Sequence, residues 1–324
     1  MVEGSESVAA GNQDVPQGEP VHEDLIAAMT DLYGRHEHTR AVHAKGVWAE
    51  GTFTATSQAA GLCRAPQLGG EPVPALVRFS NASGKPDAHD AARNGGGMAT
   101  KLRPEGAGEW DIIAVGPPVF VARTVEDFLE LLRLRRPDAE TGKPDMAALG
   151  EYLGRHPEAQ LSIQSALGAE PPASYVTVPY HSPHAFRLRD SGGGETWVRW
   201  RWRPEADEER LSDEDARARG RHHLRDELSE RLASAPAAME LVFQIRGEGD
   251  SLTDPTELWP EERETLVAGR LEISSMIDDP ERDGHIEVFD PTRLPDGIEP
   301  SDDPILHARP KAYSVSAYRR LGER

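Results

Sequence analysis

Two groups of residues in this chain have the types and spacing to do chemistry, and the first lies near the C-terminus. Arg309 and Tyr313 are four residues apart in residues 305–324, a segment with a helical pattern. Residues at this spacing share a helix face, so the guanidinium lies beside the phenol. A nearby positive charge favours the phenolate, and a phenolate oxygen is a good axial ligand for ferric haem. An Arg–Tyr pair is also common as a surface contact, so the pair alone leaves both interpretations open.

The second group surrounds His43, in the sequence RAVHAKG at residues 40–46. We predict a strand over residues 40–53, in which Ala41 and His43 point to the same face. The small Ala and Gly neighbours leave room around the imidazole, which suits a residue that transfers protons. A lone histidine is more often a surface or core residue, and the other histidines nearby lack a metal-ligand spacing.

Composition narrows the class of protein. The 324 residues carry 36 Lys+Arg against 56 Asp+Glu, and the formal net charge of −20 argues against nucleic-acid binding. A single cysteine excludes an internal disulfide and a cysteine zinc site. No apolar run approaches the roughly 20 residues of a membrane span, and the polar N-terminus lacks the layout of a signal peptide. We therefore expect a cytoplasmic protein with no nucleic-acid or membrane partner.

The elements that position these groups alternate between strands and helices. Residues 1–20 are rich in Gly, Ser, Glu and Pro and are predicted to form a disordered arm, whereas residues 21–324 contain no linker and form a single domain. Strands are predicted at 40–53, 74–84, 97–104, 110–123, 175–190, 195–204, 238–249 and 271–277. Helices are predicted at 25–34, 124–136, 146–157, 161–168, 205–234 and 305–324. Apolar stretches separated by Gly/Pro loops favour an α+β fold around an antiparallel sheet that can close into a barrel.

Taken in order, these segments resemble the haem catalase superfamily, and within it the minimal catalase-related peroxidases, over residues 22–322. RAVHAKG resembles the signature around the distal histidine, and VRFSN, GMATKL and EWDIIAVGPPVFVAR are similar to the barrel stretches that follow it. YHSPHAF, DPTELWP and FDPTRLPDGIEPSDDPILHAR match later blocks, and ARPKAY resembles the proximal-ligand helix. The resemblance implies a catalase-type antiparallel β-barrel with inserted and C-terminal helices. It also implies haem b buried between the barrel and the proximal helix.

The resemblance implies a role for each matching residue. His43 would be the distal acid–base group that moves a proton from one peroxide oxygen to the other. Ser80 would hydrogen-bond the other nitrogen of that imidazole and fix its tautomer. Tyr313 would be the axial ligand of the haem iron, and Arg309 would keep it as the phenolate.

Other matching residues would bind the haem itself. Arg40, Arg78 and Arg320 match arginines that pair with the haem propionates, as the guanidinium fork does well. Phe128 falls at the position of a phenylalanine that packs on the porphyrin. It also sits on the apolar stripe of the helix predicted to follow Thr124, so a purely structural role explains it equally well.

One departure from the full catalases bears on activity. Val115 and Gly116 stand where those enzymes carry an Asn pair, one member of which orients peroxide. The site is therefore expected to be roomier and less polar, which favours a haem peroxidase that uses hydrogen peroxide or organic peroxides to oxidise small organic donors, with weak catalase activity.

Two other functions stay open. One is an isomerase or tailoring oxidase acting on a lipid hydroperoxide or a biosynthetic intermediate, and the other, more distant, is a haem sensor or carrier. The chain also lacks the long arms through which full catalases interlock, so we expect a monomer or a small homo-oligomer.

Overall fold

The computed structural model describes residues 20–282 and 285–322, so residues 1–19 of the predicted arm lie outside it. The described residues form one ten-stranded sheet. Its strands are β1 (Gly46–Ala55), β2 (Val73–Ser80), β3 (Gly97–Leu102), β4 (Trp110–Val115), β5 (Tyr180–His181), β6 (Phe186–Arg189), β7 (Glu195–Pro204), β8 (Ala237–Ile245), β9 (Thr265–Ile277) and β10 (Ile298–Pro300).

The sheet closes on itself. Every strand pair is antiparallel, and β7 pairs with both β5 and β8. The order β1-β2-β3-β4-β5-β7-β8-β9 therefore returns to β1 and makes an eight-strand barrel, with β6 and β10 as an extension of β7. Closure removes the unpaired edges that an open sheet would expose. The predicted α+β barrel is confirmed.

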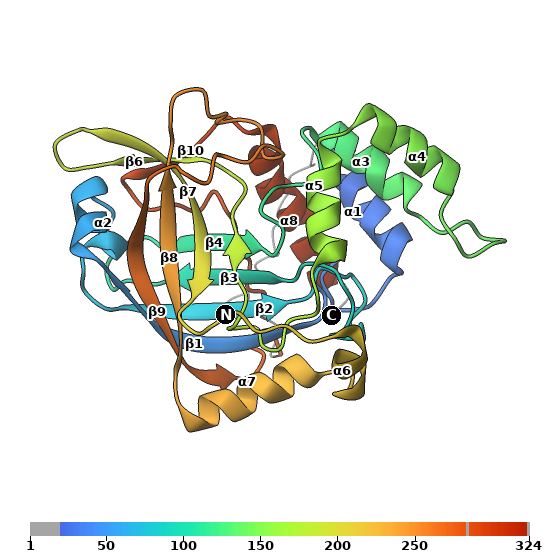
Figure 1. The fold of residues 1–324 in the computed structure, drawn as a ribbon, viewed down its shortest axis with the longest axis horizontal. Helices are drawn as coiled ribbons and strands as arrows, with labels where there is room; N and C mark the ends of the chain where they lie inside the picture. Colours follow the sequence, from blue (N-terminus) through green and yellow to red (C-terminus); the bar gives the residue numbers. More distant parts are fainter. Residues whose placement is uncertain (1–19, 283–284, 323–324) are drawn as a thin grey trace, which may run out of the picture.

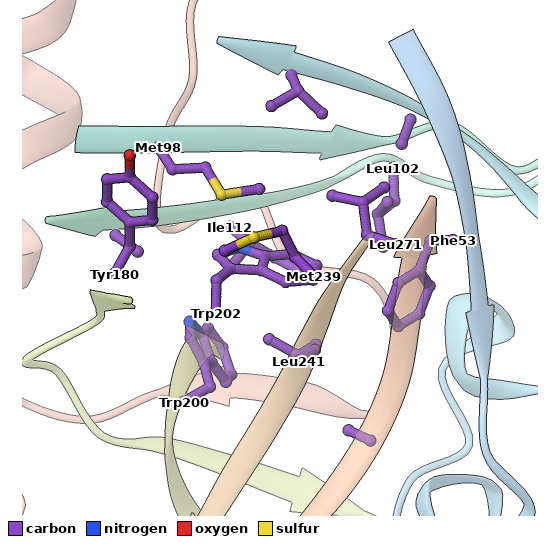
Figure 2. Close-up of a cluster of buried hydrophobic side chains, with 14 of the residues drawn as sticks. Phe53, Met98, Leu102, Ile112, Tyr180, Trp200, Trp202, Met239, Leu241 and Leu271 are labelled. Carbon is purple, nitrogen blue, oxygen red and sulfur yellow. The ribbon is translucent and has the colours of Figure 1, made fainter. Parts of the chain in front are cut away.

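Apolar side chains from all the barrel strands fill its interior. Figure 2 shows large side chains from β1, β3, β4, β5, β7, β8 and β9 meeting inside the barrel, among them Trp202 and Phe53, both fully buried. Their rings meet edge-on, with centroids 6.2 Å apart. The barrel interior is therefore a packed apolar core.

Five of the helices gather on one side of the barrel, where Figure 1 shows α1, α3, α4, α5 and α8. The helices are α1 (Pro20–Tyr33), α2 (Ser57–Leu62), α3 (Val125–Leu134), α4 (Met146–Arg155), α5 (Ala159–Gly168), α6 (Asp213–Ala218), α7 (His223–Ser234) and α8 (Pro304–Gly322), with a short 3-10 helix at Pro66–Leu68. The predicted cap of α3 is confirmed, because the Thr124 hydroxyl accepts from the Asp127 N–H at 3.1 Å. A second apolar cluster joins α1, α3 and α8. No helix in the described part of the chain is long and apolar enough to cross a membrane.

Several predicted elements differ from the structure in extent, and three of them do so for a clear local reason. The strand over residues 110–123 ends at Val115, because Gly116 is followed by two prolines that have no N–H to donate. Prolines also interrupt residues 175–190, so only the short strands β5 and β6 form there. The charged helix over residues 205–234 is two helices, α6 and α7, since Gly220 has φ +95° and ends α6 in a left-handed turn.

The prediction that His43 lies on a strand is also wrong. Strand β1 begins at Gly46, and residues 40–45 are irregular, with bends at 41–43 and 45. His43 itself has φ +55°, a left-handed conformation that is costly for a residue with a side chain. Its orientation therefore comes from contacts with other elements, described next, and not from strand alternation.

Candidate active site

A cavity lies between the barrel wall and α8, with about 880 Å³ of space that atoms do not fill, part of it open to solvent. It brings together seven of the residues singled out in the sequence: Arg40, His43, Arg78, Ser80, Arg309, Tyr313 and Arg320. The rest of its lining is mostly apolar and comes from α1, β3, β4, α8 and the segment 287–289. A large, mostly apolar cavity with a few convergent polar groups is the usual form of a small-molecule or cofactor site.

On the barrel wall, His43 and Ser80 form a hydrogen-bonded pair. The His43 Nδ1 and Ser80 Oγ atoms are 2.9 Å apart. Ser80 is the last residue of β2 and pairs with Gly97 of β3. A Cβ atom at Gly97 would lie 2.9 Å from His43 Cε1 and 3.3 Å from Ser80 Oγ, so this glycine supplies the space for the imidazole. The room around His43 thus comes from a neighbouring strand more than from its sequence neighbours.

The backbone of His43 is held by an arginine. Arg78 Nη2 donates to the carbonyl oxygens of His43 and Ala44 at 2.9 and 3.3 Å, which fixes the strained left-handed turn. Burial, followed by the charges of Arg78 and Arg309, lowers the pKa of His43 to about 3. The imidazole is therefore neutral over the physiological range and can accept a proton.

On the α8 wall, Arg309 and Tyr313 share a helix face, as predicted. Arg309 Nε donates to the Tyr313 phenol oxygen at 2.8 Å. The phenol oxygen therefore accepts from a charged donor on its own helix.

Sequence reasoning missed two residues that extend this pair, His184 and Asp303. Arg309 Nη1 lies 2.9 Å from His184 Nε2, and His184 Nδ1 lies 2.6 Å from Asp303 Oδ2. Because a guanidinium only donates, Nε2 must accept, and the ring proton sits on Nδ1 and is donated to Asp303. Burial lowers the pKa of His184, which agrees with a neutral ring. Both residues lie in segments, YHSPHAF and SDDPILHAR, whose match to the family was the available signal.

A third feature of the cavity is a cluster of arginines. Two of them surround the carboxylate of Glu281, a residue that the sequence analysis did not single out. Arg40 and Arg320 both form ion pairs with Glu281, at 2.8 and 3.0 Å. Arg78 has no carboxylate partner among the described residues, and burial together with the charge of Arg40 lowers the pKa of Arg78 well below its ordinary value. The Nε atoms of Arg78 and Arg320 are buried, with no hydrogen-bond partner in the described part of the chain. Buried donors of this kind call for an acceptor, which the described residues do not supply.

Phe128 does not line the cavity. It lies on α3, where its ring contacts Phe120 at 5.0 Å between centroids. It packs against the cluster of α1, α3 and α8, as Ala41 and Val42 also do, and these two residues line the cavity. Its predicted contact with a porphyrin stays a prediction, and its packing in the helix cluster is the role that the contacts describe.

The two positions without Asn side chains differ in the space around them. Val115 lines the cavity at the end of β4. Gly116 does not line it, and a Cβ atom at Gly116 would lie 1.8 Å from the Gly95 carbonyl oxygen. The Gly116 carbonyl oxygen accepts from His181 Nδ1 at 3.0 Å. Only position 115 can therefore carry a larger side chain into the site without moving the backbone.

This chain is similar along most of its length to proteins of one family. The catalase family model matches residues 23–324. A catalase-related peroxidase of Mycolicibacterium paratuberculosis is 39% identical over 308 residues, which cover 93% of this chain and 95% of that protein. A catalase-related peroxidase of Synechococcus elongatus is 30% identical, over 92% of this chain and 88% of that protein.

Longer catalases match as well. Catalase B of Ajellomyces capsulatus is 28% identical, and the match covers 99% of this chain but 46% of that protein. The crystal structure of a fungal catalase has a TM-score of 0.79 and 22% sequence identity, and the match covers 99% of this chain and 66% of that one. The likeness to that structure shows a shared fold. With the family model and two relatives that match nearly end to end, these comparisons establish that the chain belongs to the catalase family.

Proposed function

We propose that this protein is a haem-dependent peroxidase that uses hydrogen peroxide or an organic peroxide to oxidise small organic donors. The observation that carries this function is one cavity with two different walls. The α8 wall holds the Arg309–Tyr313 pair, and the barrel wall holds the His43–Ser80 pair. Membership of the catalase family and two relatives named catalase-related peroxidases support a peroxide-acting oxidoreductase. They do not favour a rearranging enzyme or a haem carrier.

The residues around the cavity fit a haem, the cofactor that the family implies. The unpartnered Nε atoms of Arg78 and Arg320 are suited to the carboxylates of its propionates, and the apolar lining is suited to its ring. The only cysteine, Cys63, does not line the cavity, so a thioether-linked haem has no attachment point there. These features support haem b as the cofactor.

Tyr313 would hold the iron through its phenol oxygen, and Arg309 would hold that oxygen as an anion. The hydrogen bonds behind Arg309 have one direction, because His184 donates to Asp303 through Nδ1 and accepts from Arg309 through Nε2. Arg309 is thus kept as a donor toward Tyr313. When bound, the haem would supply the two electrons that reduce the peroxide, which the side chains of this site cannot supply.

His43 would move the proton of the peroxide. With Ser80 accepting from Nδ1–H, the lone pair of Nε2 is left to take a proton from one peroxide oxygen. The same nitrogen then returns that proton to the other oxygen, which leaves as water or alcohol. The low pKa of His43 makes the protonated ring short-lived, which suits this return.

The balance between peroxidase and catalase activity would follow from position 115. Val115 lines the cavity and has no group that can hydrogen-bond a second peroxide. Because a poorly held reactant can react orders of magnitude more slowly, oxidation of a second peroxide is expected to be slow and oxidation of organic donors to dominate.

We further propose that residues 21–324 act as one haem-binding domain, present in the cytoplasm as a monomer or small homo-oligomer. The continuous barrel, whose strands come from most of the chain, supports the single domain. The assembly is tested by light scattering, and the location by fractionation of the native host.

The experiment that tests the proposed function mixes haem-loaded protein with a small excess of hydrogen peroxide and follows the optical spectrum and oxygen release together. We expect a changed spectrum that returns to the starting one only when a phenolic donor is added. Fast return with stoichiometric oxygen would instead make the protein a true catalase. No spectral change with bound haem would contradict peroxide chemistry altogether.

A further inference from the structure

Glu281 joins two of the four arginines that line the cavity, Arg40 and Arg320. Its carboxylate accepts from Arg40 Nη1 and Nη2 at 2.8 and 3.0 Å, and from Arg320 Nη1 at 3.0 and 3.1 Å. The backbone N–H of Glu287 donates to the same carboxylate at 2.9 Å. The Glu281 and Arg320 side chains are 8% and 7% exposed, so the bridge is buried. A carboxylate with this many donors is held in one orientation and holds its partners in turn.

Glu281 lies behind the cavity wall. Arg40, Arg78 and Arg320 line the cavity, whereas Glu281 does not. The carboxylate therefore binds the Arg40 and Arg320 guanidiniums without lining the cavity itself. Arg320 Nε, another donor of one of these side chains, has no partner in the described residues. Glu281 is therefore placed to orient the arginines and does not occupy the cavity.

The positive charges of Arg40, Arg78 and Arg320 explain why a carboxylate is needed behind them. Three buried guanidiniums repel one another, and burial together with this repulsion lowers the pKa of both Arg40 and Arg78. Burial raises the pKa of Glu281, but Arg40 and Arg320 outweigh it and hold that pKa below its ordinary value, so the carboxylate is ionised. Glu281 offsets only part of the positive charge of these arginines. The excess of positive charge is suited to a haem with two ionised propionates.

We propose that Glu281 is a positioning residue of the haem site, which sets Arg40 and Arg320 so that their remaining donors receive the propionates. This role rests on the haem binding proposed above. It gives Glu281 a specific signature, because a residue that acts through the arginines affects only a haem whose propionates are charged. A residue that merely holds the segment 278–287 or the end of α8 affects any haem alike.

The test compares Glu281→Gln and Glu281→Ala with the wild-type protein and with a control, Asp278→Asn. Asp278 loses the same charge from the same segment, but its side chain is 87% exposed and pairs with Arg282 on the surface. Each protein is loaded with haem b or with haem b dimethyl ester, whose propionates are uncharged. The rate of haem transfer to excess apomyoglobin is then measured, after circular dichroism has shown that each variant is folded.

We expect haem b to leave Glu281→Gln about ten- to hundredfold faster than it leaves the wild type, the range typical of supports behind a binding group. The dimethyl ester is expected to leave both at the same rate, and Asp278→Asn is expected to match the wild type with either haem. If Glu281→Ala fails to fold, Glu281→Gln still decides, because the two haems are compared within one variant.

Two results would overturn the role of Glu281. An equal acceleration for both haems means a purely structural residue, and slower loss from Glu281→Gln means a carboxylate that competes with the propionates. Failure of the wild-type protein to take up haem b at all would instead contradict the proposed function. The two failures are thereby separated.

Discussion

Asp303 holds His184 through one carboxylate oxygen and begins α8 with the other. Oδ2 lies 2.6 Å from His184 Nδ1, and Oδ1 accepts from the backbone N–H of Ile305 at 2.8 Å. The residue that caps the helix carrying Tyr313 thus also sets the side chain behind Arg309. The direction of the hydrogen-bonded chain and the placement of the helix are fixed together.

Asp303→Asn separates these two functions. Asparagine is as good a helix cap as aspartate, so its side-chain oxygen is expected to keep α8 in place. Its NH2 group then faces the buried His184 Nδ1–H, so some thermal stability is expected to be lost. The negative charge that fixes the His184 tautomer is lost, so Arg309 is held less well and the phenolate is less favoured. We expect a shift of the ferric charge-transfer band and faster haem loss. An unchanged spectrum would mean that the Asp303–His184 bond has no influence on the α8 wall.

Tyr313→Phe removes the proposed ligand oxygen while keeping the ring. We expect weak haem retention and loss of the charge-transfer band, because a phenyl group cannot coordinate iron. Tyr318→Phe is the matched control, since Tyr318 lies on the same helix with a 56% exposed side chain and does not line the cavity. A Tyr313→Phe protein with the wild-type spectrum would remove Tyr313 as the ligand.

The parts of this structure that local patterns describe were predictable from the sequence. The Arg309–Tyr313 pair needs only a helix, and β2, β3, β7 and α3 follow from apolar periodicity and capping. Each of these depends on residues a few positions apart. The barrel itself followed from the number of strands and from the family resemblance.

The parts that were missed depend on contacts between distant segments. His43 takes its left-handed turn because Arg78, 35 residues away, donates to its carbonyl. Asp303 and His184 are 119 residues apart, and Glu281 and Arg40 are 241 residues apart. No periodicity links residues at such separations, so a buried ion pair between them cannot be read from one sequence.

The stability of the haem-free protein is expected to fall as the pH falls from 7 to 5. Burial, with the charges of Arg78 and Arg309, lowers the pKa of His43 to about 3, whereas the unfolded chain binds a proton near the ordinary pKa of 6.5. The unfolded state therefore binds more protons in this range, and acid favours it, by about 2 kcal/mol for this one group. Burial lowers the pKa of His184 too, which acts in the same direction.

Urea unfolding of the haem-free protein at pH 7 and pH 5 measures this effect. His43→Gln removes the titrating ring, so its loss of stability between the two pH values is expected to be about 2 kcal/mol smaller than that of the wild type. His222→Gln is the control, because His222 is exposed at the start of α7. The same loss in wild type and His43→Gln would mean that the ring titrates normally in the folded protein.

His43→Gln is also expected to separate haem binding from peroxide chemistry. The variant keeps the arginines and Tyr313, so haem uptake is expected to be unchanged. The rate of the first reaction with peroxide is expected to fall about a hundredfold to ten-thousandfold, the usual contribution of a positioned acid–base group. Ser80→Ala leaves the imidazole but frees its tautomer, and a smaller loss is expected. Stopped-flow mixing with peroxide measures both, and a wild-type rate in His43→Gln would remove His43 from the reaction.

Val115→Asn tests what sets the balance between the two activities. The side chain lines the cavity, and an amide there supplies the hydrogen-bond donor that valine lacks. We expect the ratio of oxygen release to donor oxidation to rise by about tenfold or more, since holding the second peroxide in place accelerates its oxidation. Gly116→Asn is not an equivalent test, because its Cβ would collide with the Gly95 carbonyl and move the backbone. Val115→Leu controls for size, since leucine fills similar space without a donor and is expected to leave the ratio unchanged. A rise in both variants would point to the shape of the cavity, and a rise in neither would mean that position 115 does not decide which reductant the protein uses.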